Sequence, residues 1–209
     1  MAGAREPDGR RERSRRTRAR IVDAARTLFV DQGYRATTIE AVAERAGVAV
    51  QTVYYVFGNK PTVLAAVLDA TIAGDVEGVP VLERPWVETL GEEQDAAAAV
   101  AHLVEASVAI VARTAPIYEV VRRAAADPEV GALLDDNRRR RRADQRRLIE
   151  ILWLAGHLRP DLDVDTAADV CYALLNEEVF QLLTTDCGWD VDRFQQWATS
   201  LMQQQLVQR

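Results

Sequence analysis

Four polar side chains of the kind that bind phosphates and base edges follow one another in a short segment over residues 49–56. They are Gln51, Thr52, Tyr54 and Tyr55. Val53 and Val56 supply the apolar side of this segment, so the four polar groups are expected to face outward. Hydroxyl and amide groups donate hydrogen bonds to phosphate oxygens and to base edges. Two adjacent tyrosines on an open face therefore favour a binding partner over simple packing.

A helix-turn-helix is predicted to position this surface. Thr37 and Thr38 are both able to cap a first helix, whose apolar residues lie on one side until Gly47 ends it. A second short helix begins near Ala49. Two short helices joined by a glycine-marked turn make a helix-turn-helix, here over about residues 38–57.

A further helix is predicted from Thr17 to the neighbourhood of Gly33. Apolar residues recur in it at spacings of three and four, which places them on one face. They are Ile21, Ala24, Ala25, Leu28 and Phe29. Gly33 is suited to a left-handed C-terminal cap, and Phe29 and Tyr34 are expected in the core beneath the helix-turn-helix. The fold class predicted for this part of the chain is a three-helix, all-α head.

The segment ARIVDAARTLFVDQGYRATTIEAVAERAGVAVQTVYYVFGNKPTVLAAVLD resembles the DNA-binding head of TetR-family transcriptional regulators. The resemblance covers about residues 17–70 and includes the LF, GY, TT, AGV, T.Y and F..K motifs in register. It implies a DNA-binding domain over 17–64, with a fourth helix leading into a larger helical body over 65–209 that binds an effector and dimerises.

The resemblance also implies DNA contacts at particular positions. These are Thr37, Thr38, Val50, Gln51, Thr52, Tyr54, Tyr55 and Lys60. Gln51 is able to pair with adenine and Val50 to touch a thymine methyl group, whereas the other six are expected to hold the DNA backbone. Ala49 departs from the family, which usually places a capping residue there. That absence costs about 1 kcal/mol, and no phosphate contact is expected at this position.

Charge is distributed unevenly along the chain. Residues 1–60 carry 12 basic and 7 acidic residues, a net charge of +5, whereas the remainder carries 14 basic and 25 acidic residues, a net charge of −11. A basic head on an acidic body favours a polyanion bound at one end. Residues 1–16 contain almost no apolar residue and are predicted to form a disordered basic arm. This arm is either a solvated tail or a segment that follows DNA phosphates or enters a minor groove.

The body is predicted to be almost wholly helical. Helices are expected over about 62–74, 92–113, 116–126, 127–155 and 165–185, with a last one from about 190. The run Arg138 to Arg142 is expected to be solvated or paired with Asp135, Asp136, Asp144 and Glu150, the alternative being a second nucleic-acid surface.

Two functional surfaces of the body follow from the resemblance. It implies a mostly apolar ligand pocket, and the amphipathic faces offer candidate lining residues whose alternative role is plain core. They are Leu103, Ser107, Tyr118, Trp153, Tyr172 and Asn176. The last two helices are apolar on more than one face and so need a second partner. The family dimerises through these helices, which implies an interface at Val179, Phe180, Leu183, Phe194, Trp197 and Leu201.

Several functional classes are disfavoured. No uninterrupted run of about 18 apolar residues occurs, so no membrane span is expected. Cys171 and Cys187 are too few for a disulfide framework and lack a metal-like spacing with His102 or His157, which suits a reduced cytoplasm. Neither a phosphate loop nor a nucleophile–base pair is present, so an enzyme, a cofactor and a metal are not expected.

The sequence thus predicts a cytoplasmic homodimer that binds a palindromic operator in double-stranded DNA. It is expected to be a repressor released by a small, mostly apolar ligand. Three alternatives remain: a DNA-binding regulator with no small-molecule effector, acting as an activator or responding to a protein; an enzyme; and a helical adaptor with a vestigial head.

Overall fold

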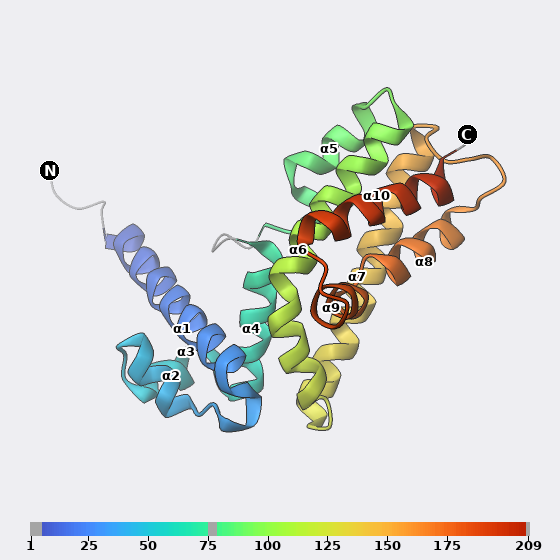
Figure 1. Cartoon of the computed structure of the whole chain (residues 1–209). Helices are drawn as coiled ribbons and strands as arrows, with labels where there is room; N and C mark the ends of the chain where they lie inside the picture. Colours follow the sequence, from blue (N-terminus) through green and yellow to red (C-terminus); the bar gives the residue numbers. More distant parts are fainter. Residues whose placement is uncertain (1–5, 75–78, 208–209) are drawn as a thin grey trace, which may run out of the picture. The chain divides into compact units, whose positions relative to one another are not determined.

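A computed structural model describes residues 6–74 and 79–207, and every regular element among them is a helix (Figure 1). The predicted all-α class is therefore confirmed for this part of the chain. The chain divides into two compact units. The head unit comprises Met1–Thr71 and Pro116–Leu133, and the body unit comprises Ile72–Ala115 and Leu134–Arg209. The head unit thus contains a second stretch of chain in addition to the predicted 17–64.

The head unit contains α1 (Glu6–Ala36), α2 (Ile39–Ala46), α3 (Val50–Phe57) and most of α4 (Lys60–Ala73). Its core is built from the apolar faces that helical periodicity predicts, including Ile21, Phe29, Val42, Val53 and Leu64. Phe29 and Tyr34 are both buried, and their rings stack with centroids 5.9 Å apart. The core positions of Phe29 and Tyr34 are confirmed.

Helix α1 differs from the prediction at its N-terminal end. Residues 6–16 are helical, whereas a disordered arm was predicted over 1–16; residues 1–5 of that arm lie outside the described residues. Glu12 pairs with Arg15 at 3.1 Å and with Arg16 at 3.2 Å, which are the spacings that support a helix. Arginine and glutamate also have high helix propensity, so a polar segment joined to an amphipathic helix is able to continue it.

The predicted ends of α2 and α3 agree with the structure. Thr38 caps α2, its hydroxyl accepting a hydrogen bond of 3.1 Å from the amide of Ala41. Gly47 ends α2 in the left-handed conformation, with φ 63° and ψ 43°. Ala49 lies at the N-cap of α3 and makes no side-chain capping hydrogen bond, because its methyl group has no acceptor.

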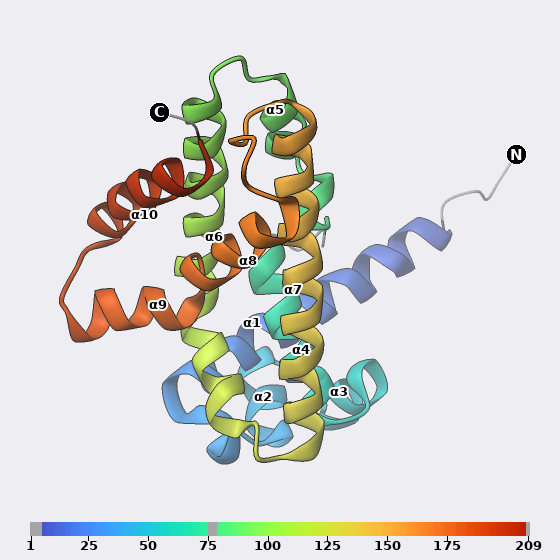
Figure 2. The ribbon, with the colours of Figure 1, turned by 90° about the vertical axis from the view of Figure 1, so that its right-hand side faces the viewer.

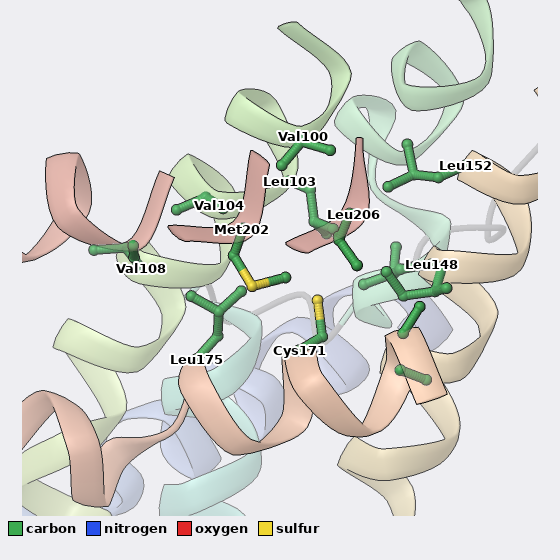
Figure 3. Packing of buried hydrophobic residues seen from close by; sticks show 14 of the residues in the cluster. Val100, Leu103, Val104, Val108, Leu148, Leu152, Cys171, Leu175, Met202 and Leu206 are labelled. Atoms are coloured by element: carbon green, nitrogen blue, oxygen red, sulfur yellow. The ribbon is translucent and has the colours of Figure 1, made fainter. Parts of the chain in front are cut away.

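The body unit contains α5 (Pro85–Glu92), most of α6 (Ala96–Ala124) and α7 (Pro128–Leu154), and then α8 (Val164–Leu174), α9 (Glu177–Gln181) and α10 (Val191–Leu206) (Figures 1 and 2). A 3-10 turn at Val81–Glu83 precedes α5, and a π-helical turn at Leu182–Asp186 follows α9. Side chains from α6, α7, α8 and α10 point toward one another in a single apolar cluster (Figure 3).

Two predicted boundaries in the body are wrong. The helices expected over 92–113 and 116–126 are one helix, α6, with Pro116 inside it. Val111, Ala115 and Ile117, on either side of the proline, are all buried, so packing outweighs its local cost. The helix expected over 165–185 is instead divided, because Asn176 accepts a hydrogen bond of 2.6 Å from the amide of Val179 and begins α9.

Three acidic residues begin α7, α8 and α10. Asp127 accepts a hydrogen bond of 3.0 Å from the amide of Glu129, and Asp190 one of 2.7 Å from the amide of Arg193, in agreement with the helix starts predicted near 127 and 190. Helix α8 begins slightly before the predicted start at 165, because Asp163 caps it with a hydrogen bond of 2.9 Å from the amide of Thr166. Asp165 instead pairs with Arg146 at 2.7 Å.

The arginines of α7 hold the neighbouring helices through ion pairs. Two of the acidic partners predicted for the run Arg138 to Arg142 are confirmed, since Asp135 and Asp136 pair with arginines of this run, whereas Glu150 pairs with Arg147, outside it. Four pairs reach other elements and were not predicted: Arg138–Glu178, Arg141–Glu177, Arg142–Asp169 and Arg146–Asp165. The fourth predicted partner, Asp144, is half-buried. Burial raises the pKa of its carboxyl above the ordinary value, and the charge of Arg140 opposes this shift only in part.

Helix α6 is long and apolar enough to cross a membrane, by length and composition alone, with a mean hydropathy of 1.5 over its most apolar 18 residues. The absence of a span was expected from the sequence because charged and polar residues interrupt the apolar ones. Core helices of globular proteins meet the same criterion. Val100, Leu103, Val104 and Val108 place one face of α6 in the apolar cluster of the body.

Candidate nucleic-acid interface

The outer face of α3 carries the polar side chains that the sequence places there. Tyr55 is 92% exposed and Tyr54 49% exposed, and Gln51 is also exposed. Val53 and Phe57 are buried on the opposite side of the helix. An exposed tyrosine pair and an amide on a short, firmly packed helix form a surface able to donate and accept hydrogen bonds and to stack.

Helix α1 fixes the turn between α2 and α3. The guanidinium of Arg20 donates to the carbonyls of Ala46 and Gly47, the latter at 2.9 Å. A Cβ atom at Gly47 would lie 2.9 Å from Nη2 of Arg20, so a side chain would displace this guanidinium as well as strain the left-handed backbone. Arg18 lies over the ring of Phe57, 4.6 Å from its centroid, at the far end of α3.

Lys60 holds the connection between α1 and α2. Its ammonium donates to the carbonyls of Tyr34 and Thr37, each at 3.0 Å, and lies 4.2 Å from the centroid of the Tyr34 ring. An ammonium has three N–H donors. A contact between Lys60 and the DNA backbone was predicted from the sequence; the structure adds a positioning role that uses two of its donors.

Thr37 and Thr38 have different environments. Thr37 is fully buried, its hydroxyl donating to the carbonyl of Gly33 at 2.9 Å and accepting from the Gln32 amide at 3.3 Å. Thr38 is exposed and caps α2. The predicted DNA contact through the Thr37 side chain is therefore corrected, because this hydroxyl is inside the head unit and has its partners there.

The start of α7 is tied to this region through Asn59. The Asn59 amide donates to Glu129 at 3.0 Å, and its oxygen caps α4 by accepting from the amide of Thr62 at 2.9 Å. The pKa of Tyr34 is raised to about 12 by burial, with Asp127 and Glu129 adding to the effect. Sequence reasoning assigned no role to Asn59, whose N-cap position before a Pro-containing first turn was the available signal.

The six candidate pocket residues are not brought together. Tyr118 is buried in the head unit, whereas the other five belong to the body unit. Trp153 is 52% exposed at the end of α7, and Asn176 is the cap of α9. Tyr172 lies beneath Arg141, whose guanidinium carbon is 4.8 Å from the ring centroid. Leu103 is in the apolar cluster, and Ser107 lies one turn further along α6.

The six residues predicted at the dimer interface fall into two groups, buried and partly exposed. Phe180 and Phe194 are buried and pack edge to face, 5.1 Å between centroids, so they are core residues of the body unit and their predicted interface role is corrected. The other four, Val179, Leu183, Trp197 and Leu201, are partly exposed. Leu182, which the sequence analysis did not select, is 53% exposed beside them in the chain.

The model of bacterial regulatory proteins of the tetR family matches residues 21–67, which include α2, α3 and the start of α4. The head of the chain is thus a tetR-family head by sequence. Its resemblance to TetR-family heads over about residues 17–70 is confirmed by this match.

Curated relatives match about a quarter to a third of the chain. The uncharacterized HTH-type transcriptional regulator YvkB of Bacillus subtilis is 46% identical over 54 residues, 26% of this chain and 29% of YvkB. The HTH-type transcriptional regulator TtgR of Pseudomonas putida is 38% identical over 60 residues, 29% of each chain. The match thus spans less than a third of the length of these relatives.

Solved structures extend the similarity to the fold of about nine tenths of the chain. FadR of Bacillus subtilis, a transcriptional regulator solved with stearoyl-CoA, has a TM-score of 0.68 at 19% identity, over 88% of this chain and 96% of FadR. A SmeT–triclosan complex has a TM-score of 0.69 at 22% identity, over 92% of each chain. At these identities the similarity shows a shared fold.

Proposed function

We propose that this TetR-family protein is a dimeric, cytoplasmic repressor that binds a palindromic DNA operator and is released by a small, mostly apolar ligand. The observation that carries the DNA-binding part is the exposed face of α3, held by α1 and α4 within a head whose sequence matches the family model. The role is that of a regulator rather than an enzyme, as for the relatives named above.

In this proposal the residues of the head divide into two groups. Gln51 and Val50 read bases, because an amide pairs with adenine and a small apolar group contacts thymine. Thr38, Thr52, Tyr54 and Tyr55 hold the backbone and set the register. Lys60 places α2 through the carbonyls of Tyr34 and Thr37 and offers its remaining donor to a phosphate.

The dimer is proposed to form through the outer sides of α9, the turn after it, and α10. Support comes from Leu182, Leu183 and Trp197, apolar side chains that the monomer leaves wholly or partly exposed. A two-fold dimer presents two heads to half-sites about one turn of DNA apart. Leu182→Arg is the sharpest test, because a charge at an exposed position leaves the monomer intact and disrupts an apolar interface. A monomer by sedimentation is expected; an unchanged dimer would place the interface elsewhere.

The ligand is proposed to enter the apolar cluster between α6, α7, α8 and α10, near Leu103 (Figure 3). FadR and SmeT, which share this fold, were solved with stearoyl-CoA and triclosan, ligands with large apolar parts. A ligand shifts the population of a DNA-binding state only by the difference between its affinities for the two states.

Selection of a duplex from a random library, followed by titration of variants, tests the DNA-binding part. Tyr55→Ala is expected to weaken binding to all sequences, whereas Gln51→Ala is expected to change the preferred base within the site. Removal of one side chain that reads a base reduces discrimination by about 1–3 kcal/mol. Equal losses on selected and scrambled duplexes for Gln51→Ala would contradict base reading by this residue. Failure to select any sequence would remove the proposed function.

A panel of apolar ligands, including an acyl-CoA and a chlorinated phenol, tests the ligand-responsive part. The expected result is a compound that raises the melting temperature of the protein and releases the selected duplex. If no compound does both, the alternative of a regulator without a small-molecule effector is favoured. Transcription from a promoter that contains the selected site, with and without the protein, then separates a repressor from an activator.

A further inference from the structure

A line of arginines continues the packed face of α1 beyond the helix-turn-helix. Helix α1 buries Ile21 and Ala25 against the head, and Arg18, on the same face, lies over Phe57 at the end of α3. Positions seven residues apart share a face of a helix, so Arg11 falls on the line of Arg18. Arg15 lies between them at the i+4 spacing. All three arginines are exposed.

The N-terminal part of α1 projects past α2 and α3 in both views of the head (Figures 1 and 2). It begins at Glu6, so more than two turns precede Thr17. The distance from residue 11 to residue 18 along a helix is about 10 Å. The same length of duplex axis carries about six phosphates. A charged helix of this length thus has the scale of a backbone contact.

We propose that Arg11, Arg15 and Arg18 form a rigid helical stripe that contacts the phosphate backbone of the duplex beside the site read by α3. The inference rests on the proposed DNA-binding function and adds to it a contact outside the helix-turn-helix. It differs from a flexible arm in a minor groove, because the arginines act through their fixed positions on a helix. Arg18 joins the stripe to α3 through Phe57.

Glu12 partly neutralises the positive charge of this stripe. Its carboxylate pairs with Arg15 and Arg16 across one helical turn, at 3.1 and 3.2 Å. These pairs are exposed, so they are weak and are readily exchanged for a phosphate. Glu12→Gln removes the competing carboxylate while it keeps helix propensity and length. The stripe thus predicts that this substitution strengthens DNA binding.

The test is the salt dependence of binding to a 30-base-pair mixed-sequence duplex, measured by fluorescence anisotropy with the full chain. The slope of log K against log salt scales with the number of phosphates that the protein neutralises, at about 0.9 for each phosphate. Arg11→Ala with Arg15→Ala is expected to lower the slope by about 1–2. Arg139→Ala with Arg147→Ala, which removes two exposed arginines of the body unit, is the charge-matched control with an unchanged slope.

Ser14→Pro separates a helix from a flexible arm. Ser14 is exposed, and a proline there becomes the first residue of a shortened helix that keeps Arg18 and Arg20 in place while residues 6–13 lose their helical support. A slope lowered by about 1, which is the share of Arg11, is expected, together with an unchanged melting temperature of the head. Glu12→Gln is expected to tighten binding about two- to threefold at low salt, as one weak competing charge is removed.

The outcomes separate the inference from the function on which it rests. A double arginine variant whose slope equals that of the Arg139 and Arg147 control overturns the stripe while DNA binding stands. A lowered slope for the arginine variant with an unchanged slope for Ser14→Pro overturns the rigid helix in favour of a flexible arm. A parent chain that binds no duplex even at low salt removes the proposed function, and the stripe with it.

Discussion

The head and the body are held together by different kinds of interaction. In the head, single side chains satisfy backbone groups at the ends of short helices. Thr38 caps the start of α2, Arg20 donates to the carbonyls at its end, and Lys60 donates to two carbonyls that precede it. In the body, a large apolar cluster is fastened by arginines of α7 that reach acids on α8 and α9. Short helices with little core are thus ordered by their ends, and long helices by their faces.

Unfolding of the two units is also distinguishable by spectroscopy. All four tryptophans, Trp86, Trp153, Trp189 and Trp197, lie in the body unit, whereas four of the five tyrosines lie in the head unit. Tryptophan fluorescence therefore follows unfolding of the body, and amide hydrogen exchange of α2 and α3 follows opening of the head. A substitution in one unit is expected to affect one signal and to leave the other unchanged.

The largest effect is expected in the body, at Glu177. Its carboxylate is buried and accepts hydrogen bonds from Arg141 at 2.8 Å and from the Thr114 hydroxyl at 3.0 Å. Removal of this carboxylate leaves the largely buried Arg141 guanidinium without its counter-charge. Glu177→Ala is expected to lower the free energy of unfolding by about 3–5 kcal/mol. Urea denaturation followed by tryptophan fluorescence measures it.

Glu178→Ala is the matched control for this change. Glu178 occupies the next position of the first turn of α9, is partly exposed and lies 3.8 Å from Arg138. Exposed pairs contribute about 1 kcal/mol or less. Equal losses for the two variants would show that the buried network contributes nothing beyond an ordinary surface charge, and the distinction between head and body would lose one of its supports.

The next effect is expected in the head, at Lys60. Lys60→Met keeps the length and apolar stem of the side chain and removes the donors to Tyr34 and Thr37. Hydrogen bonds from a charged donor contribute about 1.5–3 kcal/mol, so local opening of α2 is expected to become easier by about 2 kcal/mol. Faster hydrogen exchange in residues 39–46, with an unchanged tryptophan transition, is the expected result. Arg35→Met, an exposed basic residue at the end of α1, is the control and should have no effect.

Smaller effects of opposite sign are expected at the two N-caps of the head. Thr38→Ala removes the cap of α2 and is expected to cost about 1 kcal/mol. Ala49→Ser supplies the cap that α3 lacks and is expected to stabilise α3 by about 0.5–1 kcal/mol. Hydrogen exchange of the two helices measures both changes. Destabilisation by Ala49→Ser would mean that the extended backbone at this position does not favour a capping hydroxyl.

The smallest effect at neutral pH concerns Tyr34, whose pKa is raised from its ordinary value of 10.0 to about 12 by burial and by Asp127 and Glu129. The folded head retains the proton between these two values while the unfolded chain loses it. Stability is therefore fully present below pH 10 and falls as the pH rises from 10 to about 12. Urea denaturation followed by far-UV circular dichroism should show this loss, and Tyr34→Phe should lack it.

Local signals predicted the head well and the body only in outline. The cap at Thr38, the end at Gly47 and the outward face of α3 depend on residues within a few positions of one another. Pro116 shows the limit of such signals: it is a local reason to end a helix, yet α6 continues because its buried face is covered along its whole length. The split at Asn176 is the opposite case, in which a capping side chain interrupts an apolar run.

The sequence by itself determined the helical class, the helix-turn-helix, the outward group of Gln51, Tyr54 and Tyr55, and the basic character of the N-terminal part. Periodicity, caps and charge are properties of neighbouring residues, so one chain suffices to recognise them. Only the tertiary structure decided that Thr37 is inside while Thr38 is outside, that Phe180 and Phe194 are core, and which acids the arginines of α7 meet. These outcomes depend on helices distant in the sequence, since burial and pairing are set by whatever lies opposite a side chain.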